Sequence, residues 1–203
     1  MSELVKVYND LGMTRTRRSS NEVRVYTTHC ELDLYKGRRL PGVVTCYAYD
    51  VVATALFDAV FLDAVRALKW FLSNSGYAVS QTTHGIMFLH HIMLPKSELE
   101  VDHIDTNPLN CCSINLRYAT HSQNKQNSAI NFGSTAYKGV SIDRTTRANK
   151  KYRTYIQTNG VKYWGPRFYT PEEANQWIRA KREQLHGEFA NHGDKQLNNT
   201  NSA

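Results

Sequence analysis

Hydrophobic side chains in the first half of the chain follow a helical period. Residues 51–72 form the most apolar stretch of the chain. If they form a helix, with a rotation of about 100° per residue, their charged side chains all lie within one arc around the helix axis. These charges are Asp58, Asp63, Arg66 and Lys69. The pattern predicts an amphipathic core helix over 51–72, and the charges exclude a bilayer span, which needs ~20 apolar residues. Before this helix we expect strands at Glu22–Thr28 and Gly42–Ala48.

A period-two pattern dominates residues 134–183. Three runs of strand length are rich in β-branched and aromatic residues: Tyr137–Asp143, Tyr152–Thr158 and Val161–Phe168. Asn159-Gly160 joins the last two as a tight hairpin, and a capping box at Thr170–Glu173 opens a helix over Pro171–His186 that Gly187 ends. The segment is therefore predicted as a three-stranded antiparallel sheet, with the helix packed on one face through Ala174, Trp177, Ile178, the stem of Lys181 and Leu185.

Charge singles out the same segment. The chain has 25 Lys and Arg against 18 Asp and Glu, a net charge of +7, and residues 134–183 alone hold 11 basic and 4 acidic side chains. A local excess of this kind indicates a polyanionic partner, most simply nucleic acid, and a sheet face that bears arginines, lysines and aromatic rings can enter the major groove of double-stranded DNA. The sheet face away from the helix would carry the contacts: Lys138, Arg153, Tyr155, Lys162, Trp164 and Arg167. On charge alone, a solvated basic sheet is equally compatible.

The ends of the chain and its cysteines bear on its compartment. Residues 1–20 lack the apolar core of a signal peptide and contain three arginines, so we expect a cytoplasmic protein. The four cysteines, Cys30, Cys46, Cys111 and Cys112, form no C-x-x-C pair, which argues against a structural zinc site. In a reducing compartment they should remain thiols. The polar, Asn-rich end at 191–203 predicts a flexible tail.

Residues 76–130 gather the groups that could do chemistry. A strand, a turn-rich loop, a second strand and a capping box with its helix follow one another at Val101–Ile104, 105–115, Leu116–Ala119 and Thr120–Gln123. This order should bring Asp102, His103 and Asn124 together. A carboxylate and an amide oxygen are hard ligands suited to Mg²⁺ or Mn²⁺, and an imidazole beside them can take a proton from an attacking water. Taken singly, each His or Asn is more simply a structural residue.

This region resembles the HNH endonucleases, in the branch of the His-Me finger group where asparagine replaces the last histidine. The matching residues are His90, Asp102-His103-Ile104-Asp105, Asn115-Leu116-Arg117, Thr120, Gln123-Asn124 and Asn127. The resemblance implies a ββα-metal fold in which His103 is the general base, Asp102 and Asn124 are metal ligands, and Asn115 orients the His103 ring. His90 would have a supporting role. The loop 110–114 departs from the family, because Asn-Cys-Cys-Ser-Ile stands where Asp-Asn-Arg-Arg-Ser is usual.

Residues 134–190 resemble the Apetala or ethylene-response-factor type of DNA-binding domain. The matching residues are Tyr137-Lys138-Gly139-Val140-Ser141, Asn159-Gly160, Phe168, Thr170, Glu172-Glu173-Ala174 and Leu185-His186-Gly187-Glu188-Phe189-Ala190. In that family a three-stranded sheet docks in the major groove, which implies the same face as the charge pattern. Ile142 stands where Trp is usual, and Gly165-Pro166 stands where Leu-Gly is usual.

Together these features predict an α+β chain with a ββα-metal HNH module and a C-terminal three-stranded antiparallel sheet packed on one helix. The expected parts are an N-terminal region of unknown role (1–75), the HNH module (76–130), a linker (131–136), the DNA-binding domain (137–190) and a flexible tail (191–203). The predicted function is a phage-type, homing-endonuclease-like DNA endonuclease with one divalent metal, working in the host bacterial cytoplasm if a phage encodes it. A non-catalytic DNA-binding regulator with a degenerate module and an RNA-binding protein remain the alternatives.

Overall fold

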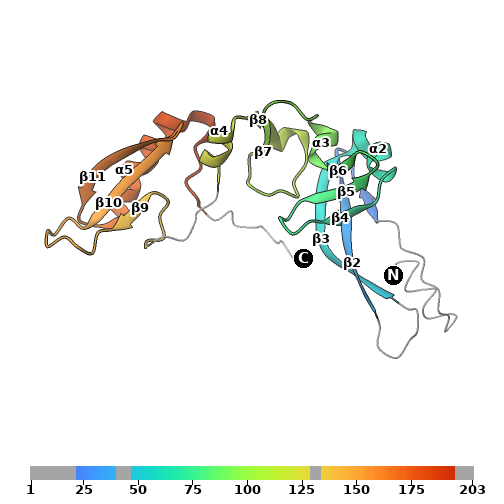
Figure 1. The fold of residues 1–203 in the computed structure, drawn as a ribbon, viewed down its shortest axis with the longest axis horizontal. Coiled ribbons are helices and arrows are strands. Elements are labelled where there is room, and N and C mark those ends of the chain that lie inside the picture. The colour runs from blue at the N-terminus through green and yellow to red at the C-terminus, as the bar shows by residue number, and fades with distance from the viewer. Residues whose placement is uncertain (1–21, 40–46, 129–133, 195–203) are drawn as a thin grey trace. The chain divides into compact units, whose positions relative to one another are not determined.

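Several small antiparallel sheets and a few helices make up the chain, which confirms the predicted α+β class (Figure 1). The computed structural model describes residues 22–39, 47–128 and 134–194. The chain divides into two compact units: unit 1 holds residues 1–96 and 107–117, and unit 2 holds residues 97–106 and 118–203. The loop at 107–117 belongs to unit 1, and the predicted domain boundaries stay a prediction. Among the described helices, none is both long and apolar enough to cross a membrane.

Unit 1 contains two three-stranded antiparallel sheets. The first has the order β1-β2-β3, with β1 at Val23–Val25, β2 at His29–Arg39 and β3 at Tyr47–Asp58. The second has the order β4-β5-β6, at Trp70–Leu72, Ala78–Thr82 and Gly85–Phe88. The short helical segments are η1 (Ala59–Phe61), α2 (Leu62–Arg66), α3 (His90–Met93) and η2 (Ser113–Asn115). Buried apolar side chains from both sheets and from α2 form the interior of the unit, among them Leu32, Leu34, Phe57, Val65 and Val79.

The predicted helix over 51–72 is wrong for its first part, because residues 51–58 belong to β3. Strand β3 pairs with β2 so that Ala55 lies opposite Leu32 and Phe57 lies opposite Cys30, and all four side chains are buried. An apolar run of this length fits both the helical and the strand period, and only the pairing partner decides between them. The α-helix is confined to α2, at Leu62–Arg66, and the predicted helix is also wrong at its end, because residues 70–72 form β4.

The two predicted N-terminal strands are confirmed only in part. A strand is found within the predicted Glu22–Thr28, at β1. The predicted strand at Gly42–Ala48 is met only from Tyr47 onward, where β3 begins, and residues 40–46 lie outside the described part of the chain. Of the four cysteines, Cys30, Cys111 and Cys112 are described, and all three are free thiols.

Unit 2 begins with the strand and helix that carry the candidate site. Strand β7 (Glu100–His103) and β8 (Leu116–Ala119) form a two-stranded sheet, and the last two residues of β8 belong to the same unit as β7. Helix α4 (His121–Gln126) follows. The Thr120 hydroxyl accepts from the Gln123 backbone N–H while the Gln123 side chain accepts from the Thr120 N–H. The predicted strands and capping box are therefore confirmed.

The rest of unit 2 is a sheet of order β11-β10-β9 covered on one face by α5. Its elements are β9 (Val140–Ile142), β10 (Tyr152–Thr158), β11 (Val161–Phe168), α5 (Pro171–His186) and η3 (Gly187–Phe189). The bounds of β10, β11 and α5 are those predicted, and the hairpin residues Asn159 and Gly160 have φ of 48° and 79°, as a two-residue turn of this type requires. Val140, Ile156, Ala174 and Ile178 form the buried core between sheet and helix.

The inner face of α5 also carries a buried arginine that the apolar pattern did not predict. Arg182 is 2% exposed, and its Nη2 donates to the carbonyl of Lys138 at 2.7 Å. Its Nη1 hydrogen-bonds to His192 Nδ1 at 3.0 Å. Burial lowers the pKa of Arg182 to about 10, so the guanidinium remains charged at neutral pH and needs these acceptors.

Gly165 allows α5 to lie close against the sheet, and its replacement tests that packing. A Cβ at this position would overlap both Thr154 Oγ1 and the Trp177 ring. We expect Gly165→Ala to lower the free energy of unfolding by about 1–3 kcal/mol, because a well-packed site cannot absorb the added methyl group. Urea unfolding followed by tryptophan fluorescence measures the change. The exposed neighbour Pro166, in the variant Pro166→Ala, is the control, and an equal loss in both variants would contradict the packing argument.

Candidate functional site

The frame of the candidate site is the face of β7 that contacts α4. Alternate residues of a strand share a face, and residues three apart share a face of a helix, so Glu100 and Asp102 can meet Asn124 and Asn127. Asn124 Nδ2 donates to Glu100 Oε2 at 2.6 Å, and Asn127 Nδ2 donates to Asp102 Oδ1 at 2.8 Å. These two hydrogen bonds hold both predicted metal ligands, Asp102 and Asn124, on one strand–helix interface.

Asn127 fixes the end of β7. It is 4% exposed, and besides binding Asp102 its Nδ2 donates to the carbonyl of His103 at 2.8 Å and to that of Ile104 at 3.3 Å. The resemblance placed Asn127 in the motif without a role. Its spacing of three residues from Asn124 was the available sign that both amides face β7.

His103, the predicted base, is 5% exposed at the end of β7. Burial is the main influence on its pKa and lowers it below the ordinary 6.5, against the opposing effect of Asp105 and Asp102. The imidazole is therefore neutral at neutral pH, which is the form that accepts a proton. The chain then turns sharply: Thr106 N–H donates to the His103 carbonyl at 2.8 Å, and Thr106 has φ of 64°. A β-branched residue in this region is strained, and such strain is typical of functional sites.

Glu100 is a second carboxylate at the site that sequence reasoning missed. Its Oε1 lies 2.7 Å from His121 Nδ1, while Oε2 accepts from Asn124. The hydrogen bond from Asn124, and then that from His121, lowers the pKa of Glu100. Because the Asn124 nitrogen is directed at Glu100, the amide oxygen, which is the atom that binds cations, is directed elsewhere. No sequence pattern predicted that Glu100 belongs to the site, because it is an exposed glutamate two residues before the motif.

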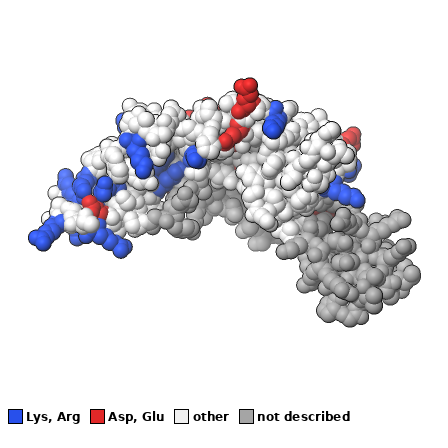
Figure 2. All heavy atoms as spheres, viewed as in Figure 1, with Lys and Arg blue, Asp and Glu red and all other residues white. Residues whose placement is uncertain are grey.

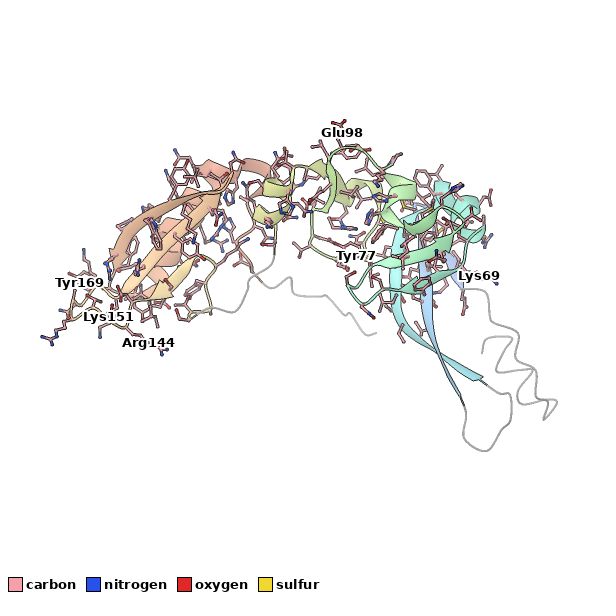
Figure 3. All side chains as sticks on the ribbon, in the orientation of Figure 1. Lys69, Tyr77, Glu98, Arg144, Lys151 and Tyr169 are labelled. Carbon is pink, nitrogen blue, oxygen red and sulfur yellow. The ribbon has the colours of Figure 1, made fainter. Side chains whose placement is uncertain are left out.

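Two further predicted residues belong to unit 1. Asn115 closes the 107–115 loop by donating from Nδ2 to the Asn110 carbonyl at 2.8 Å, and its predicted role in orienting the His103 ring stays a prediction. His90 is buried among aromatic rings. Its ring centroid lies 5.2 Å from that of Phe88 and 5.6 Å from that of Tyr77, which is labelled in Figure 3. These contacts give His90 a packing role.

The donor set fits one divalent ion. No cluster of three His, Cys, Asp or Glu side chains able to hold a metal occurs in residues 22–39, 47–128 and 134–194. The predicted ligands instead comprise one carboxylate, of Asp102, and one amide oxygen, of Asn124. A hard ion such as Mg²⁺ commonly takes one or two protein oxygens and completes its shell with water and phosphate. Both oxygens of Glu100 are engaged by neighbouring side chains, so we do not count it as a ligand.

The outer face of the C-terminal sheet collects five of the six predicted nucleic-acid contacts. In the β10–β11 register Arg153 lies opposite Arg167, Tyr155 opposite Trp164, and Gln157 opposite Lys162. The Tyr155 and Trp164 rings are 5.5 Å apart, and Arg153 Cζ lies 4.8 Å from the Trp164 ring centroid. Thr154 and Ile156, which alternate with these residues, are buried on the α5 side. The face thus interleaves cations with flat rings.

Asp143 organises the two arginines of this face. Its Oδ2 lies 2.7 Å from Arg167 Nη2 and 3.8 Å from Arg153 Nη1. Hydrogen bonds from Thr145 and then from Arg167 hold the pKa of Asp143 well below its usual range, so it stays ionised. The carboxylate therefore keeps both guanidinium groups beside one another at the start of the β9–β10 loop.

Lys138, the sixth predicted contact, lies elsewhere. Its Nζ donates to the carbonyls of Gln126 at 2.9 Å and Ser128 at 2.6 Å, after the end of α4. Burial lowers the pKa of Lys138 to about 8. An ammonium group that satisfies helix-end carbonyls and is partly desolvated is a poor phosphate contact, so we leave Lys138 out of the face. Its position just before β9 made it look like a strand residue in the sequence.

A basic loop between β9 and β10 extends the face and was also missed. It carries Arg144, Arg147, Lys150 and Lys151. Figure 2 shows Lys and Arg gathered at this end of unit 2, and Figure 3 places Arg144, Lys151 and Tyr169 together there. Lys150 Nζ lies 5.0 Å from the Tyr169 ring centroid. The sequence pattern that could have indicated this loop is its four basic residues within eight positions. The prediction considered the strands and did not include the loop between them.

Comparisons with known proteins identify the family of the chain. A family model described as HNH endonuclease matches residues 83–126, which include Asp102, His103, Asn115 and Asn124. An uncharacterised HNH endonuclease, L560, of Acanthamoeba polyphaga mimivirus is 33% identical over 133 residues, which cover 62% of this chain and 67% of that protein. No solved structure matches the chain. The chain belongs to the HNH endonuclease family. The family match ends at Gln126, so the Apetala-type resemblance of the later residues stays a prediction.

Proposed function

We propose that the protein is a DNA endonuclease that hydrolyses phosphodiester bonds with His103 as the general base. The observation that carries the proposal is the pair of hydrogen bonds between β7 and α4, which holds Asp102 and Asn124 on one interface next to a buried, neutral His103. Membership of the HNH family supports nuclease chemistry.

Each residue has a definite part in the proposed reaction. Asp102 and Asn124 would hold one divalent ion, Mg²⁺ or Mn²⁺. Such an ion, when bound, supplies positive charge that stabilises the transition state of phosphate hydrolysis. His103 accepts a proton from water as the water oxygen bonds to phosphorus, and Asn115 orients the imidazole. The bond from phosphorus to the 3′ oxygen breaks and that oxygen takes up a proton, which leaves a 5′-phosphate and a 3′-hydroxyl.

The sheet face of unit 2 is the proposed double-stranded DNA contact. Its guanidinium groups can bind guanine edges or phosphates, and its lysines can bind phosphates. Flat rings interleaved with cations favour a binding role over a merely solvated basic surface, and Trp164 is 58% exposed on this face. We assign this role to residues 137–190, as an Apetala-type domain following the HNH module of residues 76–130.

The biological setting follows as part of the same proposal. A nuclease with its own recognition surface is suited to cutting chosen sites, as homing endonucleases do. The relative from a giant virus is compatible with a viral or phage source, in which case the protein would act in the cytoplasm of the host.

A plasmid assay tests the proposed function. Supercoiled plasmid or phage DNA is incubated with the full chain and Mg²⁺ or Mn²⁺, with EDTA as the control. We expect nicked or linear products with metal and none with EDTA. DNA that is bound and never cut with either metal would instead favour the non-catalytic regulator.

A further inference from the structure

Two asparagines in series join the C-terminal segment to the candidate metal ligand. Asn191 Nδ2 donates to Asn127 Oδ1 at 3.1 Å and to the Asn127 carbonyl at 2.8 Å. Asn127 Nδ2 in turn donates to Asp102 Oδ1 at 2.8 Å. Asn191 lies 64 residues after Asn127, beyond the sheet, α5 and η3, so the C-terminal part of unit 2 contacts the site directly.

The direction of both amides is fixed by their partners. The Asp102 carboxylate and the carbonyls of His103 and Ile104 can only accept, so the Asn127 nitrogen must face them. The Asn127 oxygen then faces Asn191 and needs a donor. Asn191 supplies one because its own oxygen accepts from the Gly193 N–H at 2.7 Å, which turns its nitrogen toward Asn127. No exchange of oxygen and nitrogen in either amide preserves this set of contacts.

The segment that carries Asn191 is held against α5. Asp194 binds Arg179 Nη1 through both oxygens, at 2.8 and 2.7 Å. His192 lies 3.0 Å from Arg182 Nη1 and 3.2 Å from Glu183. The structure therefore differs from the predicted tail in its first four residues, 191–194, while residues 195–203 lie outside the described part. These anchors give Asn191 a defined position from which to act.

Contacts within unit 2 also hold α4 against the sheet. Gln126 Nε2 donates to Thr158 Oγ1 at 2.8 Å, and the Asn159 N–H donates to Ser122 Oγ at 3.0 Å. Both contacts place the hairpin end of β10 and β11 beside α4. The helix is thus supported from two sides, by the hairpin and by the segment 191–194.

We propose that Asn191 is a positioning residue for the nuclease: it fixes the Asn127 amide, and through it the Asp102 carboxylate, in the orientation that binds the divalent ion. The inference rests on the proposed function. Replacing a residue that orients a metal ligand by hydrogen bonding typically lowers metal affinity or activity by about 10–100-fold. The C-terminal part would then contribute to cutting as well as to DNA binding.

Two substitutions test Asn191. Asn191→Ala removes the donor, and Asn191→Asp keeps the acceptor for Gly193 while placing an oxygen against the Asn127 oxygen. We expect both to raise the Mg²⁺ concentration for half-maximal cleavage by about tenfold or more, with the larger effect in Asn191→Asp. DNA affinity measured in EDTA should not change. Asn74→Ala, the same substitution at an exposed asparagine in the turn between β4 and β5, is the matched control and should keep wild-type metal dependence.

A readout without metal or DNA separates this proposal from the proposed function. In ¹⁵N-labelled protein, the side-chain amide protons of Asn127 should exchange slowly with solvent, and they should shift and exchange faster in Asn191→Ala but not in Asn74→Ala. If the wild type cuts no DNA, the proposed function fails, and the amide signals still decide whether Asn191 fixes Asn127. Unchanged Asn127 signals in Asn191→Ala, or wild-type metal dependence in both Asn191 variants, would overturn the proposal.

Discussion

Replacing His103 by alanine is expected to lower the single-turnover rate of DNA cleavage by about 10²–10⁴-fold, which is the usual contribution of a positioned general base. The neutral, buried imidazole is the proton acceptor that the site offers next to Asp102. The variant should bind DNA as the wild type does, because the proposed contacts to DNA lie on the sheet of unit 2. Measurements use labelled duplex with protein in excess, so that binding and chemistry are separated.

A matched histidine provides the control. His84 lies exposed in the turn between β5 and β6, outside the proposed site. His84→Ala should therefore retain the wild-type rate. A His103→Ala protein that cleaves at the wild-type rate would remove His103 from the mechanism, whatever the control shows.

Neutralising the sheet face is expected to weaken DNA binding and make it less dependent on salt. The triple variant Arg153→Ala, Lys162→Ala, Arg167→Ala removes three cations that lie on one face in the β10–β11 register. Each phosphate contact that is lost should reduce the slope of log K against log salt by about 0.9. The slope should thus fall by up to about 2.7 if all three bind phosphate, and affinity should drop most at low salt. Fluorescence anisotropy with a labelled duplex at several salt concentrations measures both.

The control for this variant changes net charge by the same amount elsewhere. Arg66, Lys69 and Lys96 belong to unit 1, and their joint replacement by alanine also removes three positive charges. If this set lowers affinity and salt slope as much as the sheet set does, net charge and not the sheet face governs binding.

Local signals in the sequence predicted the C-terminal fold closely. The capping boxes at Thr120 and Thr170 and the hairpin at Asn159-Gly160 involve residues that satisfy one another within a few positions, so their geometry is encoded locally. The two-residue period of β10 places Arg153 and Tyr155 on one face, opposite Arg167 and Trp164, whereas the spacing of three between Trp164 and Arg167 departs from that period. Asp102, His103 and Asn124 were predicted to come together, and the strand–helix contacts place them in one unit.

Features that depend on contacts between residues far apart in the sequence were not predicted. Residues 51–58 became a strand because β2 supplies its pairing edge, which no local period reveals. Lys138 donates to carbonyls at and just after the end of α4. Asn191 contacts Asn127, which lies 64 residues earlier in the chain. Glu100 became part of the site because the fold brings His121 and Asn124 to it. In each case a long-range contact, and not the residue's neighbours in sequence, determines its role.

Chemical rescue of a His103→Gly variant tests directly whether the His103 imidazole is the general base. The variant lacks the imidazole and keeps Asp102, Asn124 and the sheet face. Plasmid cleavage with Mg²⁺ is followed with increasing concentrations of free imidazole. We expect negligible cleavage without imidazole and a rate that rises and then saturates as imidazole takes the place of the missing ring. Cleavage at the wild-type rate without imidazole would contradict this expectation.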